Sequence, residues 1–220
     1  MLSPTTAAFG SQTISTTSSA KVLTLSNTGG LALTINSYTL SGTNPTNFTQ
    51  TQTCGTTLAA GATCTISVVF KPISVGARSA TLTVATTGGS VAATLTGTGA
   101  APPAVAVLSP SALSFPAQTV GKTGTAKAFT LSNTGGSPLT ISTYSFTGAN
   151  AADFSQTHTC GASLAAGAAC SISVVFKPAT TGGRLANLAV ATSAGSVTQA
   201  VSGFGLATAV APKVTLGVEE

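Results

Sequence analysis

The chain has 220 residues, of which 5% are charged, whereas soluble domains usually carry about 25% charged residues. The formal net charge of +5 reflects a shortage of acids, and the cations are widely spaced without aromatic neighbours, which argues against a nucleic-acid partner. No stretch approaches the roughly 18 apolar residues of a membrane span, and weak charge repulsion between molecules favours self-association.

An internal repeat divides the chain into two similar halves. Residues 2–99 align with residues 108–205 at an offset of 106 positions without a gap, and about half of the aligned positions are identical. Repeats of this length are whole domains in tandem. The sequence therefore predicts a first domain at 1–99, a linker at 100–107, a second domain at 108–205 and a C-terminal tail at 206–220.

Alternation of apolar and polar residues predicts strands along nearly the whole first copy. Seven strands are expected, at Thr5–Phe9, Lys21–Ser26, Leu31–Leu40, Phe48–Thr53, Thr63–Lys71, Ala77–Thr86 and Ser90–Thr98. Seven short strands in about 100 residues are typical of an immunoglobulin-like β-sandwich. We therefore predict an all-β chain with two such sandwiches in tandem.

Turn residues occur where this arrangement needs them. The sequence SNTGG is expected to join two strands at Ser26 and again at Ser132, and its Asn and Gly residues tolerate positive φ. Pro72 and Pro178 are expected to end strands because proline cannot donate to a sheet ladder.

Strand parity predicts an aliphatic core. The expected inward residues of the first copy, each with a partner 106 positions later, are Leu23, Leu25, Leu33, Ile35, Ile66, Val68, Phe70, Leu82, Val84, Val91 and Leu95. Lys21 and Lys127 share this parity and are expected to extend to solvent at strand ends. An isopeptide bond from these lysines needs a neighbouring acid, which the first copy lacks.

All four cysteines lie in two matching stretches. Cys54 and Cys64 flank GTTLAAGAT, and Cys160 and Cys170 flank GASLAAGAA. Two disulfides, Cys54–Cys64 and Cys160–Cys170, would each close a loop of about ten residues and contribute roughly 3 kcal/mol. A zinc site is disfavoured by the wide spacing, while free structural thiols remain the alternative in a reducing compartment. The expected disulfides predict a secreted or cell-surface protein.

Four motifs of the second copy are distinctive: LSPSALSF at Leu108, LSNTGGSPLTIS at Leu131, the block from Gly148 to the FKP sequence, and VSGFG at Val201. They resemble the bacterial choice-of-anchor D repeats of the ASH group of immunoglobulin-like, PapD-like domains. The resemblance implies sandwiches of seven or eight strands in large secreted or surface proteins, acting as spacer, adhesion or filament modules. It implies no catalytic residues, and the segment after Leu206 departs from the pattern.

The sequence contains few residues suited to catalysis. The acids are Asp153, Glu219 and Glu220, and the single histidine is His158, so a Ser-His-Asp arrangement would have to rest on His158 and Asp153 of one copy. No nucleophile elbow or phosphate-binding loop accompanies them. No enzyme activity, metal or cofactor is expected, and His158 is interpreted as an exposed polar residue next to a disulfide.

The linker and the tail suggest how the domains are used. AAPPAVAV at 100–107 contains two prolines, which favour an extended, semi-rigid connection. The tail alternates apolar residues, so it is expected either to lead into a third repeat or to add a strand to a neighbouring subunit. The residues of this expected assembly strand are Val210, Val214, Leu216 and Val218.

Two functions follow from these observations. The favoured one is a non-catalytic structural module of a secreted or cell-surface bacterial protein: a spacer, an adhesin stalk or a filament subunit that contacts neighbouring repeats or its own copies. The alternative is an accessory module of a secreted enzyme or adhesin that binds a glycan or another polymer. The scarcity of aromatic residues outside expected strands weakens the alternative.

Overall fold

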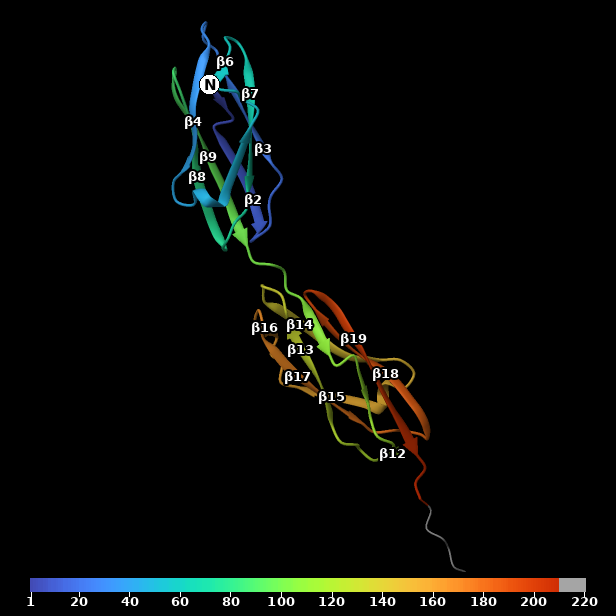
Figure 1. The fold of residues 1–220 in the computed structure, drawn as a ribbon. Helices are drawn as coiled ribbons and strands as arrows, with labels where there is room; N and C mark the ends of the chain where they lie inside the picture. The colour runs from blue at the N-terminus through green and yellow to red at the C-terminus, as the bar shows by residue number, and fades with distance from the viewer. Residues whose placement is uncertain (210–220) are drawn as a thin grey trace, which may run out of the picture. The chain divides into compact units, whose positions relative to one another are not determined.

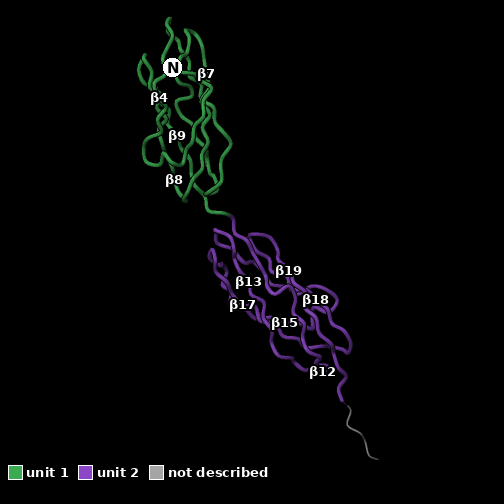
Figure 2. Tube along the Cα trace, in the orientation of Figure 1, with its two compact units in different colours: residues 1–102 green, residues 103–220 purple. Residues whose placement is uncertain are grey.

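The computed structural model describes residues 1–209, which form strands, turns and two short 3-10 helices. The chain divides into two compact units, Met1–Pro102 (unit 1) and Pro103–Glu220 (unit 2), shown in Figure 2. Alternation of apolar and polar residues gives each strand one buried face, so each unit closes as two packed sheets.

Unit 1 is a sandwich of two sheets (Figure 1). The first sheet contains, in spatial order, β1 (Leu2–Ser3), β3 (Lys21–Ser26), β7 (Thr63–Phe70) and β5 (Phe48–Gln52). The second contains β2 (Thr6–Thr13), β9 (Gly89–Ala100), β8 (Gly76–Thr86), β4 (Leu33–Ser41) and β6 (Thr57–Leu58). Neighbouring strands are antiparallel except β2 and β9, which run parallel. The helix η1 (Pro45–Asn47) precedes β5.

Unit 2 repeats this arrangement. Its first sheet contains β10 (Ala106–Ser109), β13 (Lys127–Asn133), β17 (Ala169–Phe176) and β15 (Phe154–His158). The second contains β11 (Ala112–Ser114), β19 (Gly195–Leu206), β18 (Gly182–Thr192), β14 (Leu139–Thr147) and β16 (Ser163–Leu164), with β12 (Gln118–Thr119) also paired to β19. The helix η2 (Ala151–Asp153) precedes β15.

The predicted fold class is confirmed, but the strand boundaries differ from the expected ones in two places. The single strand expected at Thr5–Phe9 is replaced by β1 and the longer β2, because the chain leaves one sheet after Ser3 and joins the other at Thr6. The sequence also gave no sign of β6, whose two residues are too short for a period to be visible. Unit 1 therefore has nine strands instead of seven.

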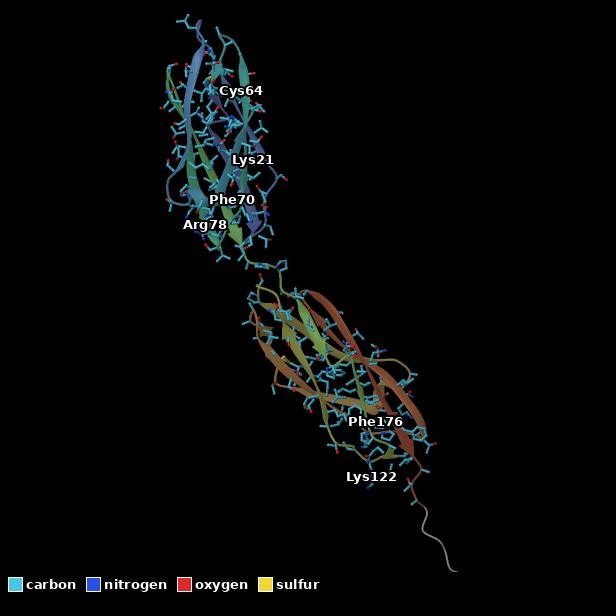
Figure 3. All side chains as sticks on the ribbon, viewed as in Figure 1. Lys21, Cys64, Phe70, Arg78, Lys122 and Phe176 are labelled. Carbon is cyan, nitrogen blue, oxygen red and sulfur yellow. A yellow bond between two sulfur atoms is a disulfide. The ribbon has the colours of Figure 1, made fainter. Side chains whose placement is uncertain are left out.

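The core lies between the two sheets of each unit, at the positions that parity predicted. Nine of the eleven expected inward residues of unit 1 are buried, while Leu33 and Val91 are partly buried and pack against the same cluster. In unit 2, ten of the eleven equivalents are buried, and Val197 is partly buried. Phe70 and Phe176 are fully buried between the sheets (Figure 3).

The SNTGG turns do not use the positive φ that their Asn and Gly residues tolerate. Among the described residues, the only residue other than glycine with positive φ is Ser15, and the glycines with positive φ do not include those of either SNTGG turn. Asn27 and Asn133 are instead buried polar residues. Their role is structural, and it lies at the centre of the site described next.

Candidate functional site

The four cysteines form two disulfides in equivalent places. Cys54 pairs with Cys64 and Cys160 with Cys170, and the Cα atoms of each pair are 5.1 Å apart. Cys64 lies in β7 of unit 1, where Figure 3 labels it, and its partner follows β5. No cysteine of the chain is left as a free thiol. This geometry leaves no thiolate for the zinc site considered from the sequence.

Each disulfide closes a loop that crosses between the two sheets. In unit 1 the chain leaves β5 in the first sheet, forms β6 at the edge of the second sheet, and returns to β7 in the first. Leu58 of β6 is buried in the core, and its equivalent in unit 2 is Leu164. The disulfide therefore joins the two ends of the segment that leaves the first sheet, pairs with the edge of the second and returns. We name residues 54–64 and 160–170 the disulfide loops.

A buried asparagine connects the turn after the second strand to the disulfide loop. Asn133 is 1% exposed, and its backbone bonds to the loop through Ala168 O and Gly167 N, both at 2.9 Å. Its side-chain amide donates to three carbonyl oxygens, at 2.8 to 3.2 Å, which belong to Ser137, Leu164 and Ala165. Because a buried amide without partners is costly, these bonds specify the asparagine at this position.

The same asparagine also holds the linker. The Val105 amide donates to Asn133 Oδ1 at 3.2 Å, and Thr134 N donates to Val105 O at 2.9 Å. Gly136 N donates to Pro103 O at 3.2 Å, and Ala106 and Val107 continue into β10. We name residues 103–107 the linker segment. Its hydrogen bonds to the turn of unit 2 are made by its backbone groups.

Glycine at position 135 is required by this contact. A Cβ atom built at Gly135 would lie 2.1 Å from Pro103 O and 2.6 Å from both Ala104 Cα and Val105 N. Contacts under 3.0 Å to backbone atoms cannot be relieved by a side-chain rotation, so only glycine lets the linker segment lie this close. Ala104 and Ala106 pack against the core of unit 2 on the same side.

A second cluster lies between the facing edges of the two sheets, on β4 and β5 and on their equivalents. His158 stacks on Tyr144 with ring centroids 4.1 Å apart and an interplanar angle of 20°. Burial raises the pKa of the Tyr38 and Tyr144 phenols by desolvation. The two hydroxyls have no hydrogen-bond partner among residues 1–209. The structure therefore shows these tyrosines partly buried at the sheet edge.

His158 and Asp153 do not form a catalytic pair. Asp153 is buried at the end of η2, where its Oδ1 accepts a bond from Ala179 N at 3.0 Å and its Oδ2 lies 3.5 Å from Arg184 Nε. His158 ends the strand that follows, β15, and five residues of extended chain span roughly 16 Å. The Nδ1 atom of His158 lies 3.1 Å from Cys160 O. Both side chains are therefore engaged in separate structural contacts.

The remaining predicted positions are placed as follows. Lys21 and Lys127 are exposed at strand starts, and the Lys127 ammonium donates to Ser114 O at 2.6 Å. The expected assembly strand, with Val210, Val214, Leu216 and Val218, lies outside the described residues. Within residues 1–209 no group of three or more histidines, cysteines or acids is arranged to hold a metal ion. No helix in that range is long and apolar enough to cross a membrane.

The sequence analysis missed the linker-binding role of the Asn-Thr-Gly-Gly turn. Its signal was present, because Asn and Gly recur at the same offsets in both copies, Asn27 with Asn133 and Gly29 with Gly135. The asparagine was attributed to turn conformation, and nothing local in the sequence relates it to Leu164, 31 residues away.

Comparison with solved structures gives likenesses of low sequence identity, over the whole chain in one case and over about half of it in two. A structure described as a protein of unknown function from Porphyromonas gingivalis W83 is 14% identical, with a TM-score of 0.40, over 93% of this chain and 98% of that chain. An ASH/PapD-like domain of human CEP192 is 16% identical with a TM-score of 0.39, over 47% and 87%. The Vibrio cholerae VesB protease is 20% identical with a TM-score of 0.35, over 46% and 31%. None of these is strong enough to transfer an activity or a partner.

The clearest comparison concerns the first domain. No curated protein sequence matches the chain. Residues 1–100, however, match the family model of the HYDIN/CFA65/VesB-like, Ig-like domain. The first unit is therefore similar to this family and is an immunoglobulin-like domain, and the second unit repeats its topology.

Proposed function

We propose that this chain is a non-catalytic structural module of a secreted or cell-surface protein, working as a spacer, an adhesin stalk or a filament subunit. The observation that carries this proposal is the binding of the linker segment to unit 2 through Asn133, Thr134 and Gly136. A connection held by backbone bonds and a buried amide transmits pulling force into the sandwich instead of into a loose tether.

The structural contacts of Asp153, His158 and the cysteines support a non-catalytic role. Asp153 pairs with Arg184, His158 stacks on Tyr144, and all cysteines are in disulfides. Catalysis needs a positioned acid, base or nucleophile near a substrate site, and these groups are already used by the fold.

The disulfides support an extracellular setting, since such bonds persist in oxidising compartments. The resemblance of the cysteine-to-FKP block to choice-of-anchor D repeats favours the same setting. We place the chain among those repeats as part of this proposal.

Force spectroscopy tests the mechanical role. A full chain pulled from its two ends should give two unfolding events of similar size, and reduction of the disulfides should lengthen each by about ten residues, roughly 35 Å. The load-bearing role would be overturned if the unfolding force of the two domains were no higher than that of a molten chain. Electron microscopy of the purified chain should show elongated particles or fibres.

A second candidate function rests on one exposed aromatic residue. Phe204 is 51% exposed on the outer face of β19, and Leu185 on the neighbouring strand β18 is also exposed. Their equivalents in unit 1, Thr98 and Ser79, are polar, so this apolar pair is specific to unit 2. An aromatic face of this kind suits a sugar ring, and a glycan array with the full chain and with Phe204→Ser tests that alternative.

A further inference from the structure

The strand β5 of unit 1 and the strand β15 of unit 2 each leave one sheet edge open. Each strand lies at the end of its sheet and pairs only with β7 or β17 within residues 1–209. Each pairing runs over five residues without a register shift. The sequences FTQTQ and FSQTH contain no proline, lysine, arginine or acid, which are residues that block exposed edges in other proteins. Both edges are therefore able to accept a further strand.

The other sheet edges of the two units are protected. In the first sheets, β1 and β10 end directly before Pro4 and Pro110. In the second sheets, the register of β2 shifts between Ala8 and Ser11, and its place in unit 2 is taken by the short strands β11 and β12. The opposite edge is formed by the two-residue strands β6 and β16, beside register shifts in β4 and β14. Since short strands, bulges and prolines prevent pairing between edges, β5 and β15 are the regular open edges of the described chain.

The backbone groups that point out of this edge follow from the alternation of hydrogen-bonded residues in an antiparallel pair. Directly before β5, Lys71 N donates to Asn47 O at 2.8 Å, so residue 47 and every second residue after it face β7. Gln50 and Gln52 therefore direct their backbone N–H and C=O groups away from the sheet. Unit 2 has the equivalent bond at the same distance, so its outward groups are those of the residues 106 positions later.

We propose that β5 pairs antiparallel with β5 of a second copy of the chain, and that β15 pairs with β15 of a second copy in the same way. The residues around Gln50 read Thr-Gln-Thr in both directions, so a two-fold axis through Gln50 places the strand opposite its own complement. The residues around Gln156 read Ser-Gln-Thr, which keeps a hydroxyl on each side of the glutamine. This self-complementary order favours a second copy of the chain over an unrelated strand.

The outward backbone groups find partners in this arrangement. Gln50 N of each copy donates to Gln50 O of the other, and Gln52 N of each copy donates to Phe48 O of the other. The Phe48 amide is not required, because it already donates to Pro45 O. The equivalent amide at the start of β15 is bonded to η2 in the same way. The contact therefore uses only donors that the fold of each unit leaves free.

Side chains on the outer face support the same register. Thr49 and Thr51 are exposed, and the axis through Gln50 places Thr49 of one copy directly opposite Thr51 of the other. They form a non-hydrogen-bonded pair, in which the Cα atoms lie about 4.5 Å apart and threonine side chains attract each other. Ser155 and Thr157 form the equivalent pair in unit 2. No lysine, arginine or acid of these strands meets its like, so charge repulsion does not oppose the contact.

Two such edges let each copy bind two neighbours. The contact through β5 is symmetric and closed by itself, and so is the contact through β15. Alternating use of the two contacts produces an open chain of copies. The inference rests on the proposed structural function and specifies the strands through which a filament grows.

Sedimentation of the full chain over a range of concentrations tests the proposal. We expect assemblies larger than dimers, which the pair Thr49→Lys, Thr51→Lys should reduce to dimers held by β15. The pair Ser155→Lys, Thr157→Lys should likewise leave dimers held by β5. All four substitutions together should weaken association by about tenfold or more at each contact, because lysines then lie directly opposite lysines. A parent chain that stays monomeric would overturn the proposal.

A matched control separates edge pairing from a change in net charge. Thr94 and Thr96 have the same spacing as Thr49 and Thr51 and are also exposed, but they lie on β9, which is paired on both sides. The variant Thr94→Lys, Thr96→Lys should assemble as the parent chain does. If the control lost assembly to the same extent as the edge variants, the edge assignment would be wrong.

Hydrogen exchange identifies the strands without any substitution. From dilute to concentrated solution, the Gln50 and Gln156 amides should gain about tenfold or more in protection as copies associate. The amides of Thr51 and Thr157, which bond within their own sheets, should change little. Assembly without added protection at Gln50 and Gln156 would show that copies meet through another surface. Monomers that still unfold under force as two resistant domains would refute the edge pairing and leave the spacer function intact.

Discussion

The side-chain oxygen of Asn133 accepts a hydrogen bond from the Val105 amide at 3.2 Å, and through this bond the segment entering unit 2 is attached to its core. The same asparagine reaches the disulfide loop, whose ends are joined by Cys160 and Cys170. The linker segment, the turn and the disulfide loop of unit 2 are therefore connected by hydrogen bonds through Asn133. A substitution in one of them should lower the stability of the other two.

Replacing Asn133 with alanine should destabilise unit 2 by about 2 to 3 kcal/mol, because three carbonyl oxygens around a buried amide lose their shared donor. Each unit has its own core, so native-state hydrogen exchange of individual amides, which reports on each unit separately, is the suitable measurement. Protection of the Thr134 amide should fall most. Asn187→Ala, at an exposed position of β18, is the control and should change little.

Glycine to alanine changes at equivalent positions should have different effects in the two units. Gly135→Ala places a Cβ against Pro103 O, and we expect a loss of about 1 to 3 kcal/mol together with release of the linker segment. Gly29→Ala should leave the stability of unit 1 nearly unchanged. Thermal unfolding would measure the loss of stability in each variant, and hydrogen exchange at Thr134 N and Gly136 N would measure release of the linker segment. Equal effects in the two units would contradict the role given to Gly135.

Two further glycines support the large aromatic residues of the core. A Cβ at Gly203 would lie 2.4 Å from Phe176 Cε1, and Gly97 stands in the same relation to Phe70 at 2.5 Å. Gly203→Ala should therefore displace a fully buried ring that stacks on Phe154 at 5.0 Å, and we expect about 1 to 3 kcal/mol of destabilisation in urea unfolding. A stabilised protein would show that the ring has room to move.

Removal of one disulfide by Cys54→Ser with Cys64→Ser should cost unit 1 about 3 kcal/mol, the entropy of closing a loop of this length. Because the disulfide loop carries Leu58 into the core, exchange protection in β6 should be lost before that in β7. Unit 2, with its own disulfide, is the internal control. Loss of protection in both units would mean that their stabilities are coupled.

Stability should fall in alkaline solution through the two tyrosines. The folded-state pKa values of Tyr38 and Tyr144 are raised by burial, so the folded state favours the neutral phenol. This stability is present below the unfolded pKa of about 10 and is lost as pH rises from there through the folded pKa. Urea midpoints measured between pH 8 and 11 should show the fall. The double variant Tyr38→Phe, Tyr144→Phe should flatten it, and an unchanged slope would assign it to other groups.

The amino-acid sequence by itself determined the features that depend on local pattern. Alternation along β3, β7 and β8 identified Leu23, Val68 and Leu82 as core residues, because neighbouring side chains of a strand point to opposite faces. The repeat established two domains of one fold. The equal spacing of the cysteines in both copies indicated a short closed loop.

Tertiary structure alone decided what lies far apart in sequence but close in space. The strand β6 exists because the disulfide loop reaches the edge of the opposite sheet, and β2 pairs with β9 more than 80 residues later. Asn133 could be recognised as the link between turn, linker and loop only once Leu164 and Val105 were brought to it. A residue's periodic pattern reports which face it occupies, whereas its hydrogen-bond partners depend on how the sheets are packed and connected.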